Sequence, residues 1–303
     1  MQALAGRLTA VSRTKWVGHM TQHHSRVASA LALHPPAAVK RSRPKKADKV
    51  MNMRVLASGL TLAAVVLIWY LVTGPLNLIR SLKFPSISDA YGSLSYLIEP
   101  GYAGATLLQH IGSSLLLVLL GFGAALITGV SLGIVMGWNR KADAFLNPVF
   151  QIIRPIAPIA WIPLTILWFG MGMSAKIFVI WLAAFSPVLI NTHTGIRNTS
   201  STLIEAAKVH GASNQRLLWK VALPSALPFV FTGMRMSLQA CWMVLVAAEL
   251  VGSFMGLGHI LIVATRDLDS GMIFVAMCSI AILGVLMSAL LGMLERRLLP
   301  WRQ

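Results

Sequence analysis

Acidic residues are scarce in this chain of 303 residues: nine Asp and Glu stand against 26 Lys and Arg, and charged residues make up only 12% of the total. Hydrophobic residues make up 56%, and the mean hydropathy is +0.72. This composition is outside the range of ordinary soluble domains. It indicates that a lipid bilayer is the main solvent of the folded chain.

Cysteine and clustered metal ligands are scarce as well. The two cysteines, Cys241 and Cys278, lie inside apolar runs, where a thiol behaves as a small hydrophobic group, so neither a disulfide framework nor a cysteine-based metal site is expected. The eight histidines are scattered, and no HExxH or paired-carboxylate spacing accompanies them. A GxxxxGK[ST] phosphate loop is also missing, so this chain is not expected to be an ATP-binding subunit. We expect no catalytic residues, no metal and no cofactor in this chain.

The charge that is present is concentrated at the N-terminus. Eleven of the 26 Lys and Arg fall in the first 54 residues, where Asp48 is the one acid. Residues 1–53 offer too little apolar surface to fold, so they are predicted to be a disordered basic tail. Next to an apolar segment, such a tail is more simply interpreted as a flank facing anionic lipid than as a nucleic-acid-binding arm. Its composition also fits an organellar transit peptide, and a start assigned too far upstream fits equally, because Met51 and Met53 directly precede the first apolar segment.

Six apolar segments reach or approach the roughly 20 helical residues that a bilayer core of about 30 Å requires. They are Val55–Val72, Leu107–Met136, Phe150–Phe169, Ile177–Thr194, Phe229–Val251 and Met272–Leu294. With six spans, the Lys and Arg clusters within residues 45–54, 140–141, 197–220 and 296–302 all fall on one side, and the opposite loops carry fewer. Because cytoplasmic loops carry the excess of basic residues, both termini are predicted to be cytoplasmic.

Glycine and proline mark two of these segments. Glycines recur every four residues in the second segment, which predicts close packing of another helix, either from this chain or from a second copy: Gly129, Gly133 and Gly137. Prolines interrupt the third segment, and each one removes a backbone donor: Pro155, Pro158 and Pro163. We expect a kinked or interrupted helix buried among others, since lipid cannot satisfy the freed carbonyl groups.

Two ionisable residues, Arg235 and Glu249, fall inside the fifth segment, where a charge at bilayer depth costs about 3 kcal/mol. In one helix they lie about 21 Å apart along the axis, so they cannot pair with each other. Arg235 is near the cytoplasmic end, from which its head group can reach the interface. Glu249, near the other end, either supports packing there or faces a polar pathway. Together with Pro158 and Pro163, these two residues are candidates for pathway or gating residues.

The stretch Glu205–Pro228, EAAKVHGASNQRLLWKVALPSALP, is polar and too broken to cross a bilayer. The segment Thr202–Glu205 has the spacing of a capping box that starts a helix, and Gly211 can end this helix in a left-handed conformation. Ser213 can cap a second helix, which Pro224 is expected to stop. Helices of about eight to ten residues are marginal in water, so this helix-turn-helix needs a surface to pack against.

The order of residues in this stretch is similar to the EAA loop, EAA-x3-G-x9-[IV]-x-LP, of permease subunits of bacterial ATP-binding-cassette (ABC) importers. The matching positions are Glu205, Ala206, Ala207, Gly211, Val221, Leu223 and Pro224. Three further stretches, RPIAPIAWIPLTILWFG, LINTHTGIR and VLVAAELVG, resemble the nitrate, taurine and aliphatic-sulfonate branch of these permeases. The resemblance covers about residues 54–300 and leaves the N-terminal tail outside.

The resemblance implies an all-α integral membrane protein, similar to type I ABC importer permeases, with six transmembrane helices in residues 54–300 and a cytoplasmic helix-turn-helix coupling loop at residues 198–226. It also implies partners: two ATP-binding subunits that bind ATP and Mg²⁺, a second permease copy, expected to be identical, and a periplasmic solute-binding protein. In the family, the loop helix docks in a cleft of the ATPase. By this resemblance Glu205 stabilises the helix and contacts the ATPase, Ala206 and Ala207 permit close approach, and Gly211 makes the turn.

The resemblance therefore predicts a multi-pass protein of the bacterial inner membrane that is not an enzyme and moves a small solute inward. A taurine-, sulfonate- or nitrate-like anion is the expected substrate. The alternative is an ATP-independent secondary carrier or channel, in which the broken third segment and Glu249 bind a coupling ion. Such a carrier would transport alone in liposomes. A scaffold that only anchors partners through its loop predicts no flux and leaves Arg235 and Glu249 unexplained.

Overall fold

The structure is a computed structural model that describes residues 45–73 and 84–300. Apart from one isolated β-bridge, between Tyr102 and Ala105, the regular structure of these residues is helical, as predicted. By their contacts the described residues fall into two units, which divide after Ala64. The helical elements are α2 (Lys45–Thr73), α3 (Ile87–Ile98), α4 (Leu107–Trp138), α5 (Arg140–Ile153), η1 (Pro158–Trp161), α6 (Ile162–Phe169), α7 (Met173–Arg197), α8 (Ser201–Val209), α9 (Asn214–Leu217), η2 (Leu218–Ala222), α10 (Leu223–Gly252), α11 (Leu257–Arg266) and α12 (Ser270–Leu298).

The tail predicted to be disordered covers residues 1–53. Its residues 1–44 lie outside the described part of the chain. From Lys45 onward the chain is part of α2, and the disorder of the tail stays a prediction. Lys, Met and Ala in residues 45–53 are good helix formers, which allows the helix of the first apolar segment to extend into its basic flank.

Four helices are long and apolar enough to cross a bilayer: α4, α7, the continuous helix Asn214–Gly252, and α12. They correspond to the second, fourth, fifth and sixth predicted segments. The third segment is split between α5 and the helical stretch Pro158–Phe169, which together give a fifth candidate if they form one span. The first segment lies in α2, whose apolar part, Gly59–Thr73, is shorter than the other candidates. The described residues thus form a multi-pass membrane protein with four or five candidate spans.

The glycines of α4 pack against α7 of the same chain. A Cβ atom added to Gly133 would lie 2.7 Å from the Cβ atom of Thr192, and one added to Gly129 or Gly137 would crowd the next residues along the same face of α7. On an adjacent face of α7, an added Cβ at Gly233 of α10 would lie 3.1 Å from the Pro187 carbonyl oxygen. Because these helices approach so closely, α4, α7 and α10 form one packed body, and the glycine spacing predicted in α4 serves internal packing.

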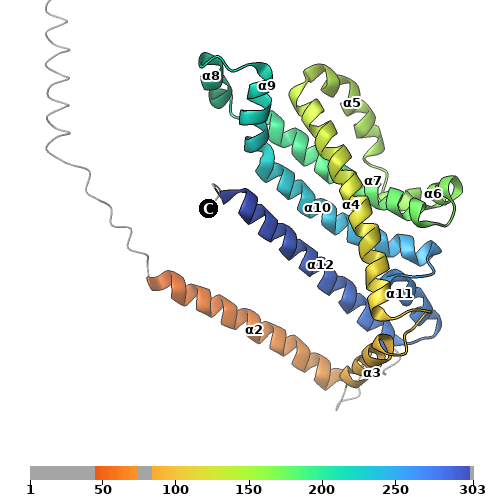
Figure 1. Ribbon diagram of the computed structural model, residues 1–303. Helices are drawn as coiled ribbons and strands as arrows, with labels where there is room; N and C mark the ends of the chain where they lie inside the picture. The colour runs from red at the N-terminus through yellow and green to blue at the C-terminus, as the bar shows by residue number, and fades with distance from the viewer. Residues whose placement is uncertain (1–44, 74–83, 301–303) are drawn as a thin grey trace, which may run out of the picture. The chain divides into compact units, whose positions relative to one another are not determined.

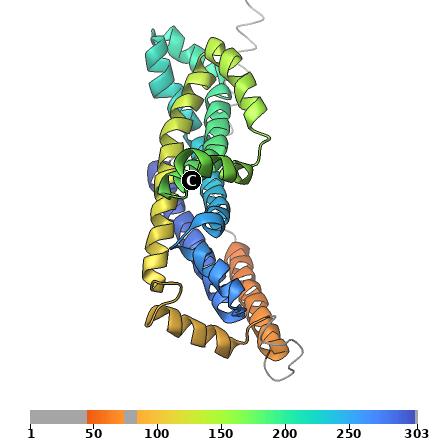
Figure 2. The same cartoon turned by 90° about the vertical axis from the view of Figure 1, so that its right-hand side faces the viewer.

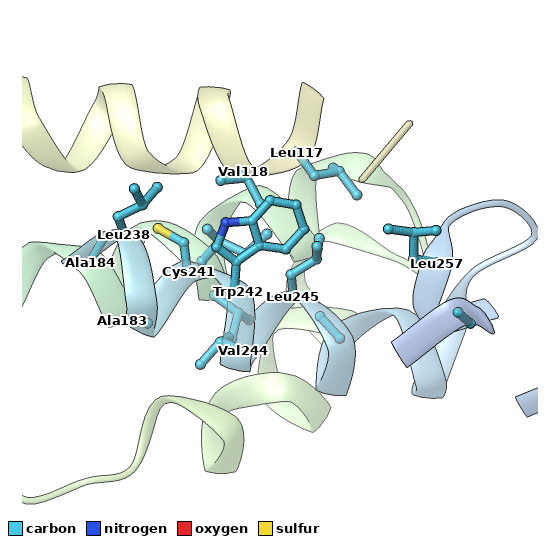
Figure 3. Close-up of a cluster of buried hydrophobic side chains, with 14 of the residues drawn as sticks. Leu117, Val118, Ala183, Ala184, Leu238, Cys241, Trp242, Val244, Leu245 and Leu257 are labelled. Carbon is cyan, nitrogen blue, oxygen red and sulfur yellow. The ribbon is translucent and has the colours of Figure 1, made fainter. Parts of the chain in front are cut away.

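Buried apolar side chains continue this body toward α11. Figure 3 shows side chains of α4, α7, α10 and α11 in one cluster, among them Leu117, Ala184, Trp242, Leu245 and Leu257. Leu257 is the first residue of α11, and it is fully buried. The beginning of α11 is therefore part of the same core as the three long helices.

The prolines of the third segment separate helices and do not kink a continuous one. Pro155 lies in the break after α5, Pro158 occupies the first turn of η1, and Pro163 occupies the first turn of α6. The first turn tolerates proline because its N–H groups have no partner within the helix. The bend between the two halves is 82°. Of the two expectations, a kinked or an interrupted helix, the interruption is confirmed.

Two helices of the structure were not predicted, α3 and α11. α3 begins at a capping box, in which the Ser86 hydroxyl accepts the Asp89 N–H and the Asp89 carboxylate accepts the Ser86 N–H. α11 lies at the C-terminal end of α10 and α3 lies beside α12, whereas α8 and α9 lie at the N-terminal end of α10 (Figures 1 and 2). The helix Asn214–Gly252, about 58 Å long at 1.5 Å per residue, therefore connects the predicted coupling loop with α11 at the opposite end.

Candidate functional site

The first helix of the predicted coupling loop, α8, starts earlier than the sequence suggested. Its N-cap is Ser200, which makes no side-chain capping bond, and Thr202 and Glu205 are exposed residues inside the helix. The capping box at Thr202–Glu205 is therefore wrong. The alternative start is available because Ser200 is itself a favoured N-cap residue type, and Ser, Thr and Glu are all accommodated within a helix.

The predicted end of this helix is confirmed. Gly211 has a φ of +75°, a left-handed conformation that favours glycine. Its N–H donates to the Lys208 carbonyl over 2.9 Å, and the Ala212 N–H donates to the Ala207 carbonyl over 3.1 Å. These two bonds form a Schellman motif, which ends α8 and satisfies carbonyl groups that have no partner within the helix.

The second helix of the loop does not stop at Pro224. Ser213 caps it as predicted, because its hydroxyl accepts the Arg216 N–H, but the helix then continues to Gly252. The proline is accommodated by a π-helical turn, η2, in which the Leu223 N–H donates to the Leu218 carbonyl, five residues back. A wider turn of this kind relieves the clash that a proline ring makes in a regular α-helix. The loop is thus joined to α10 without a break.

A groove lies between α8 and the start of α10. Its lining includes four of the residues that match the EAA pattern: Ala206, Ala207, Val221 and Pro224. The remaining lining residues are Leu203, His210, Lys220 and Ser225. Glu205 and Gly211 are exposed outside this lining, and Leu223 packs on a small buried cluster of Ile196, Ala222 and Ala226. The structure therefore brings the small and apolar EAA residues together and leaves Glu205 on the outer surface.

The loop presents apolar side chains that nothing in the described chain covers. α8 has no buried residue. Leu203 is 52% exposed, Val209 86% and Trp219 62%. A nine-residue helix that buries none of its side chains has little to stabilise it alone, so this surface has the properties of a docking site for another protein.

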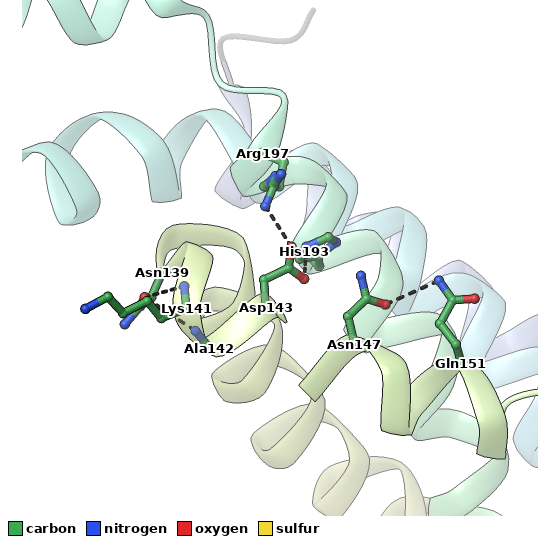
Figure 4. A network of polar contacts seen from close by, with 8 residues as sticks. All are labelled: Asn139, Lys141, Ala142, Asp143, Asn147, Gln151, His193 and Arg197. Atoms are coloured by element: carbon green, nitrogen blue, oxygen red, sulfur yellow. Dashed lines mark hydrogen bonds and ion pairs between the residues drawn. The ribbon is translucent and has the colours of Figure 1, made fainter. Parts of the chain in front are cut away.

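An ionic network fastens α5 beside the entry of the loop. Asn139 caps α5 by accepting the N–H groups of Lys141 and Ala142, and Asp143 then reaches across to α7. The Arg197 guanidinium donates to Asp143 over 2.8 Å, and His193 Nε2 lies 3.1 Å from the other carboxylate oxygen (Figure 4). Arg197 is the last residue of α7, so this network holds α5 against the point where the coupling loop begins.

Arg235 pairs with Glu295 of α12, an acid that the sequence had not indicated as its partner. The guanidinium is about half exposed, as the prediction of a head group near the interface allows. Arg235 and Glu249 do not pair with each other. Pro158 and Pro163 lie at the beginnings of η1 and α6, away from both charges in the sequence and on separate elements. Because Arg235 and Glu249 lie about 21 Å apart along α10, the four candidate pathway residues do not form one cluster.

Glu249 has no exposed surface and is bound on two sides. It accepts a hydrogen bond from the Ser114 hydroxyl of α4 over 2.8 Å and one from the Gly258 N–H of α11 over 2.7 Å. A Cβ atom added to Gly256 would lie 2.2 Å from a carboxylate oxygen of Glu249. Of the two interpretations of Glu249, the geometry favours packing at the far end of α10.

Two further side chains at this end were missed in the sequence. Ser114 also accepts the Leu257 N–H over 2.9 Å, and His110 Nδ1 accepts the Gly256 N–H over 3.0 Å. His110 Nε2 lies 2.9 Å from the Tyr102 carbonyl oxygen, which can only accept, so Nε2 is the donor in this contact. The sequence does show that His110 and Ser114, four positions apart, share one face of a helix. It does not show that this face meets the backbone of Gly256 and Leu257, which is distant in sequence.

Tyr102 holds the other end of α11. Its hydroxyl donates to Asp267, which follows the last residue of the helix. Burial and this hydrogen bond to a carboxylate raise the pKa of Tyr102 well above its ordinary value, so the phenol remains a donor at any physiological pH. Lys176 of α7 adds a contact through the Ser253 hydroxyl, to which it donates over 2.7 Å. The beginning of α11 is thus held by His110, Ser114 and Glu249, and the residue after its end is held by Tyr102.

Comparison with known proteins agrees with this architecture. Residues 129–300 match the family described as binding-protein-dependent transport system inner membrane component. The chain is 36% identical over 252 residues to the taurine transport system permease protein TauC of Escherichia coli, covering 83% of this chain and 91% of TauC. It is 35% identical over 244 residues to the putative aliphatic sulfonates transport permease protein SsuC of Bacillus subtilis, covering 80% and 87%.

Two other similarities complete this picture. The bicarbonate transport system permease protein CmpB of Synechococcus elongatus is 38% identical over 188 residues, which are 62% of this chain and 68% of CmpB. In fold, the chain resembles a solved structure of the MetNI methionine ABC transporter in an inward-facing conformation, with a TM-score of 0.56 and 19% identity over 63% of this chain and 95% of that one. The chain therefore belongs to the binding-protein-dependent inner membrane components, the permease subunits of ABC transporters, in the branch of taurine and aliphatic-sulfonate permeases.

Proposed function

We propose that this chain is the membrane-spanning subunit of an ABC importer, and that ATP-driven movement enters it through the coupling loop, residues 198–226. The observation that carries the proposal is the uncovered surface of α8 and its groove, lined by Ala206, Ala207, Val221 and Pro224. In the protomer, six spans would place both termini and this loop in the cytoplasm, and the basic residues around the loop support that orientation.

In this proposal the loop docks in a cleft of an ATP-binding subunit. The small side chains of Ala206 and Ala207 let the partner approach the helix backbone, and the apolar residues of the groove give it a surface to bind. Glu205, exposed on α8, is placed to contact the partner directly. The Schellman motif at Gly211 and the unbroken helix from Asn214 to Gly252 make the loop stiff, so a displacement of α8 is passed on as a rigid-body movement.

The assembly proposed here contains two copies of the permease, two ATP-binding subunits and a periplasmic solute-binding protein in a bacterial inner membrane. ATP and Mg²⁺ would be bound by the ATP-binding subunits, and this chain would contribute no residue to hydrolysis. The descriptions of the relatives, which are named for taurine, aliphatic sulfonates and bicarbonate, support a small anionic or zwitterionic substrate such as taurine, an alkanesulfonate or nitrate.

Reconstitution tests this function. The permease, its ATP-binding subunit and its binding protein are assembled in proteoliposomes, and uptake of labelled taurine, an alkanesulfonate and nitrate is followed with and without ATP. We expect uptake only with ATP and only when the ATP-binding subunit is present. Uptake by the permease alone would instead establish an ATP-independent carrier. Thermal-shift measurements on the binding protein with the same compounds identify the substrate independently.

A further inference from the structure

The beginning of α11 is held by an arrangement that packing alone does not require. Three consecutive backbone N–H groups, those of Gly256, Leu257 and Gly258, each donate to a side chain of another helix: His110, Ser114 and Glu249 respectively. We call these three side chains the α11 clamp. An α-helix leaves its first N–H groups without partners inside the helix, and they are usually satisfied by neighbours in sequence or by water. Here they are satisfied from α4 and α10.

The clamp is buried and internally connected. His110, Ser114 and Glu249 have no exposed surface, and the Ser114 hydroxyl both donates to Glu249 and accepts from Leu257. Glycine at positions 256 and 258 is required by the closeness of Glu249, because an added Cβ atom would lie 2.2 Å from its carboxylate oxygen at position 256 and 2.7 Å from its Cβ atom at position 258. In a buried site a hydrogen bond that is lost leaves an unsatisfied partner, which costs more than the bond contributes. The clamp therefore holds α11 in one position relative to α4 and α10.

The clamp lies at the opposite end of α10 from the coupling loop, so it can pass on a displacement of that loop. Glu249 lies near the end of the continuous helix Asn214–Gly252, whose other end carries the coupling loop. α4, α7 and α10 are packed at glycine contacts that leave no room for one to slide past another without opening the interface. A rigid body with the coupling loop at one end and a tightly held helix at the other transmits displacement between them.

We propose that Glu249, Ser114 and His110 are positioning residues of the transport cycle, which make α11 move together with the α4–α7–α10 body. On the proposed function, ATP-driven displacement of the coupling loop then reaches α11 on the opposite side of the membrane. The reverse also follows, because coupling between two sites is reciprocal: a signal from the binding protein on that side reaches the ATPase through the same contacts. This inference rests on the proposed function and adds to it a route through named residues.

Three variants of the reconstituted complex test the route. Ser114→Ala removes one hydroxyl, and with it the acceptor for Leu257 and the donor to Glu249. Glu249→Gln keeps the size of the side chain and replaces one of the two accepting oxygens by an NH2 group, which can only donate. Ser237→Ala is the matched control, because Ser237 is also a fully buried serine that donates across helices, to the Ala184 carbonyl over 2.6 Å, but it joins α10 to α7 and does not touch α11.

The expected result is a split between hydrolysis and transport. In Ser114→Ala and Glu249→Gln, ATP hydrolysis without the binding protein stays within about twofold of wild type. Uptake per ATP hydrolysed falls at least tenfold, and stimulation of hydrolysis by the taurine-loaded binding protein is lost. Hydrogen exchange of the amides at 256–258 becomes at least tenfold faster. The control changes none of these ratios.

Two results would overturn the route. One is faster amide exchange at 256–258 with the uptake per ATP and the stimulation unchanged, which would show that α11 need not be held for transport. The other is a loss of assembled complex in both variants, with hydrolysis and uptake falling in parallel, which would assign the clamp to folding alone. A failure of the proposed function looks different, because the wild-type complex itself would then show no ATP-driven uptake of taurine, an alkanesulfonate or nitrate.

Discussion

Asp143 of α5 and Arg197, the last residue of α7, form an ion pair with 2.8 Å between the carboxylate and the guanidinium. The pair fastens α5 to the residue that leads into the coupling loop. Because the Arg197 side chain is 43% exposed, solvent screens the interaction, and we expect it to contribute about 0.5 kcal/mol.

Replacement of Asp143 by Asn should therefore loosen α5 slightly. A loss of about 0.5 kcal/mol corresponds to a roughly twofold increase in local opening, which hydrogen exchange of the α5 amides measures. Asn147→Ala is the control, since the Asn147 side chain bonds Gln151 within the same helix and does not reach α7. Equal exchange in both variants would show that the ion pair does not hold α5.

Gly211→Val should uncouple the loop. A left-handed conformation costs a residue with a side chain about 1–2 kcal/mol, and a β-branched residue fits it least, so the Schellman motif should be lost and the end of α8 should fray. We expect ATP-driven uptake to fall at least tenfold while the complex remains in the membrane. Gly211→Asn serves as the control because Asn tolerates this conformation. Space does not limit either variant, since an added Cβ atom at this position meets nothing within 4 Å.

Pro224→Ala should change how the loop is oriented. The new N–H group restores a donor, which lets the π-turn at 218–222 relax to a regular helix. A π-turn holds about one residue more than an α-helical turn, so its loss rotates the preceding part of the loop by about 100° around the helix axis. We expect the melting temperature to be kept or raised and uptake per ATP to fall. Pro228→Ala, one turn further along α10, should leave that ratio near wild type. Wild-type uptake per ATP hydrolysed in the Pro224→Ala variant would contradict this explanation of the π-turn.

Gly133→Ala should destabilise the packed body of α4, α7 and α10. The new methyl group would lie 2.7 Å from the Thr192 Cβ atom and 3.0 Å from the Leu189 carbonyl oxygen, so one helix must move. Overpacking of this kind costs about 1–3 kcal/mol. Gly123→Ala on the same helix is the control, since its Cβ atom meets nothing within 4 Å. Thermal unfolding in detergent should show a lower melting temperature for the first variant and no decrease for the second.

The sequence predicted well those features that depend on a few neighbouring residues. The left-handed turn at Gly211, the cap at Ser213 and the interruption of the third apolar segment by prolines each follow from the conformational limits of one residue type. The close approach at Gly133 was also predicted, although its partner, α7, was not, because helix faces do not identify which helix they will meet.

The predictions that failed rested on local residue preferences, which other parts of the structure outweighed. Pro224 was expected to stop a helix, but a single wide turn accommodates it, and the packing of α10 outweighs the local preference. The predicted capping box at Thr202 does not form, because the helix starts earlier, with Ser200 as its N-cap residue. Glu249 was recognised as costly in a membrane, yet its hydrogen-bond donors come from Ser114, which is far away in sequence, and from the backbone of a helix that had not been predicted.

The exposed side chains of the coupling loop have a consequence for handling the protein. Leu203, Val209 and Trp219 would form an adhesive surface on any permease molecule that is made without its ATP-binding subunit. Such molecules should self-associate and be cut by proteases near α8. Co-expression of both subunits is therefore expected to raise the yield of intact, monodisperse protein more than any change of detergent.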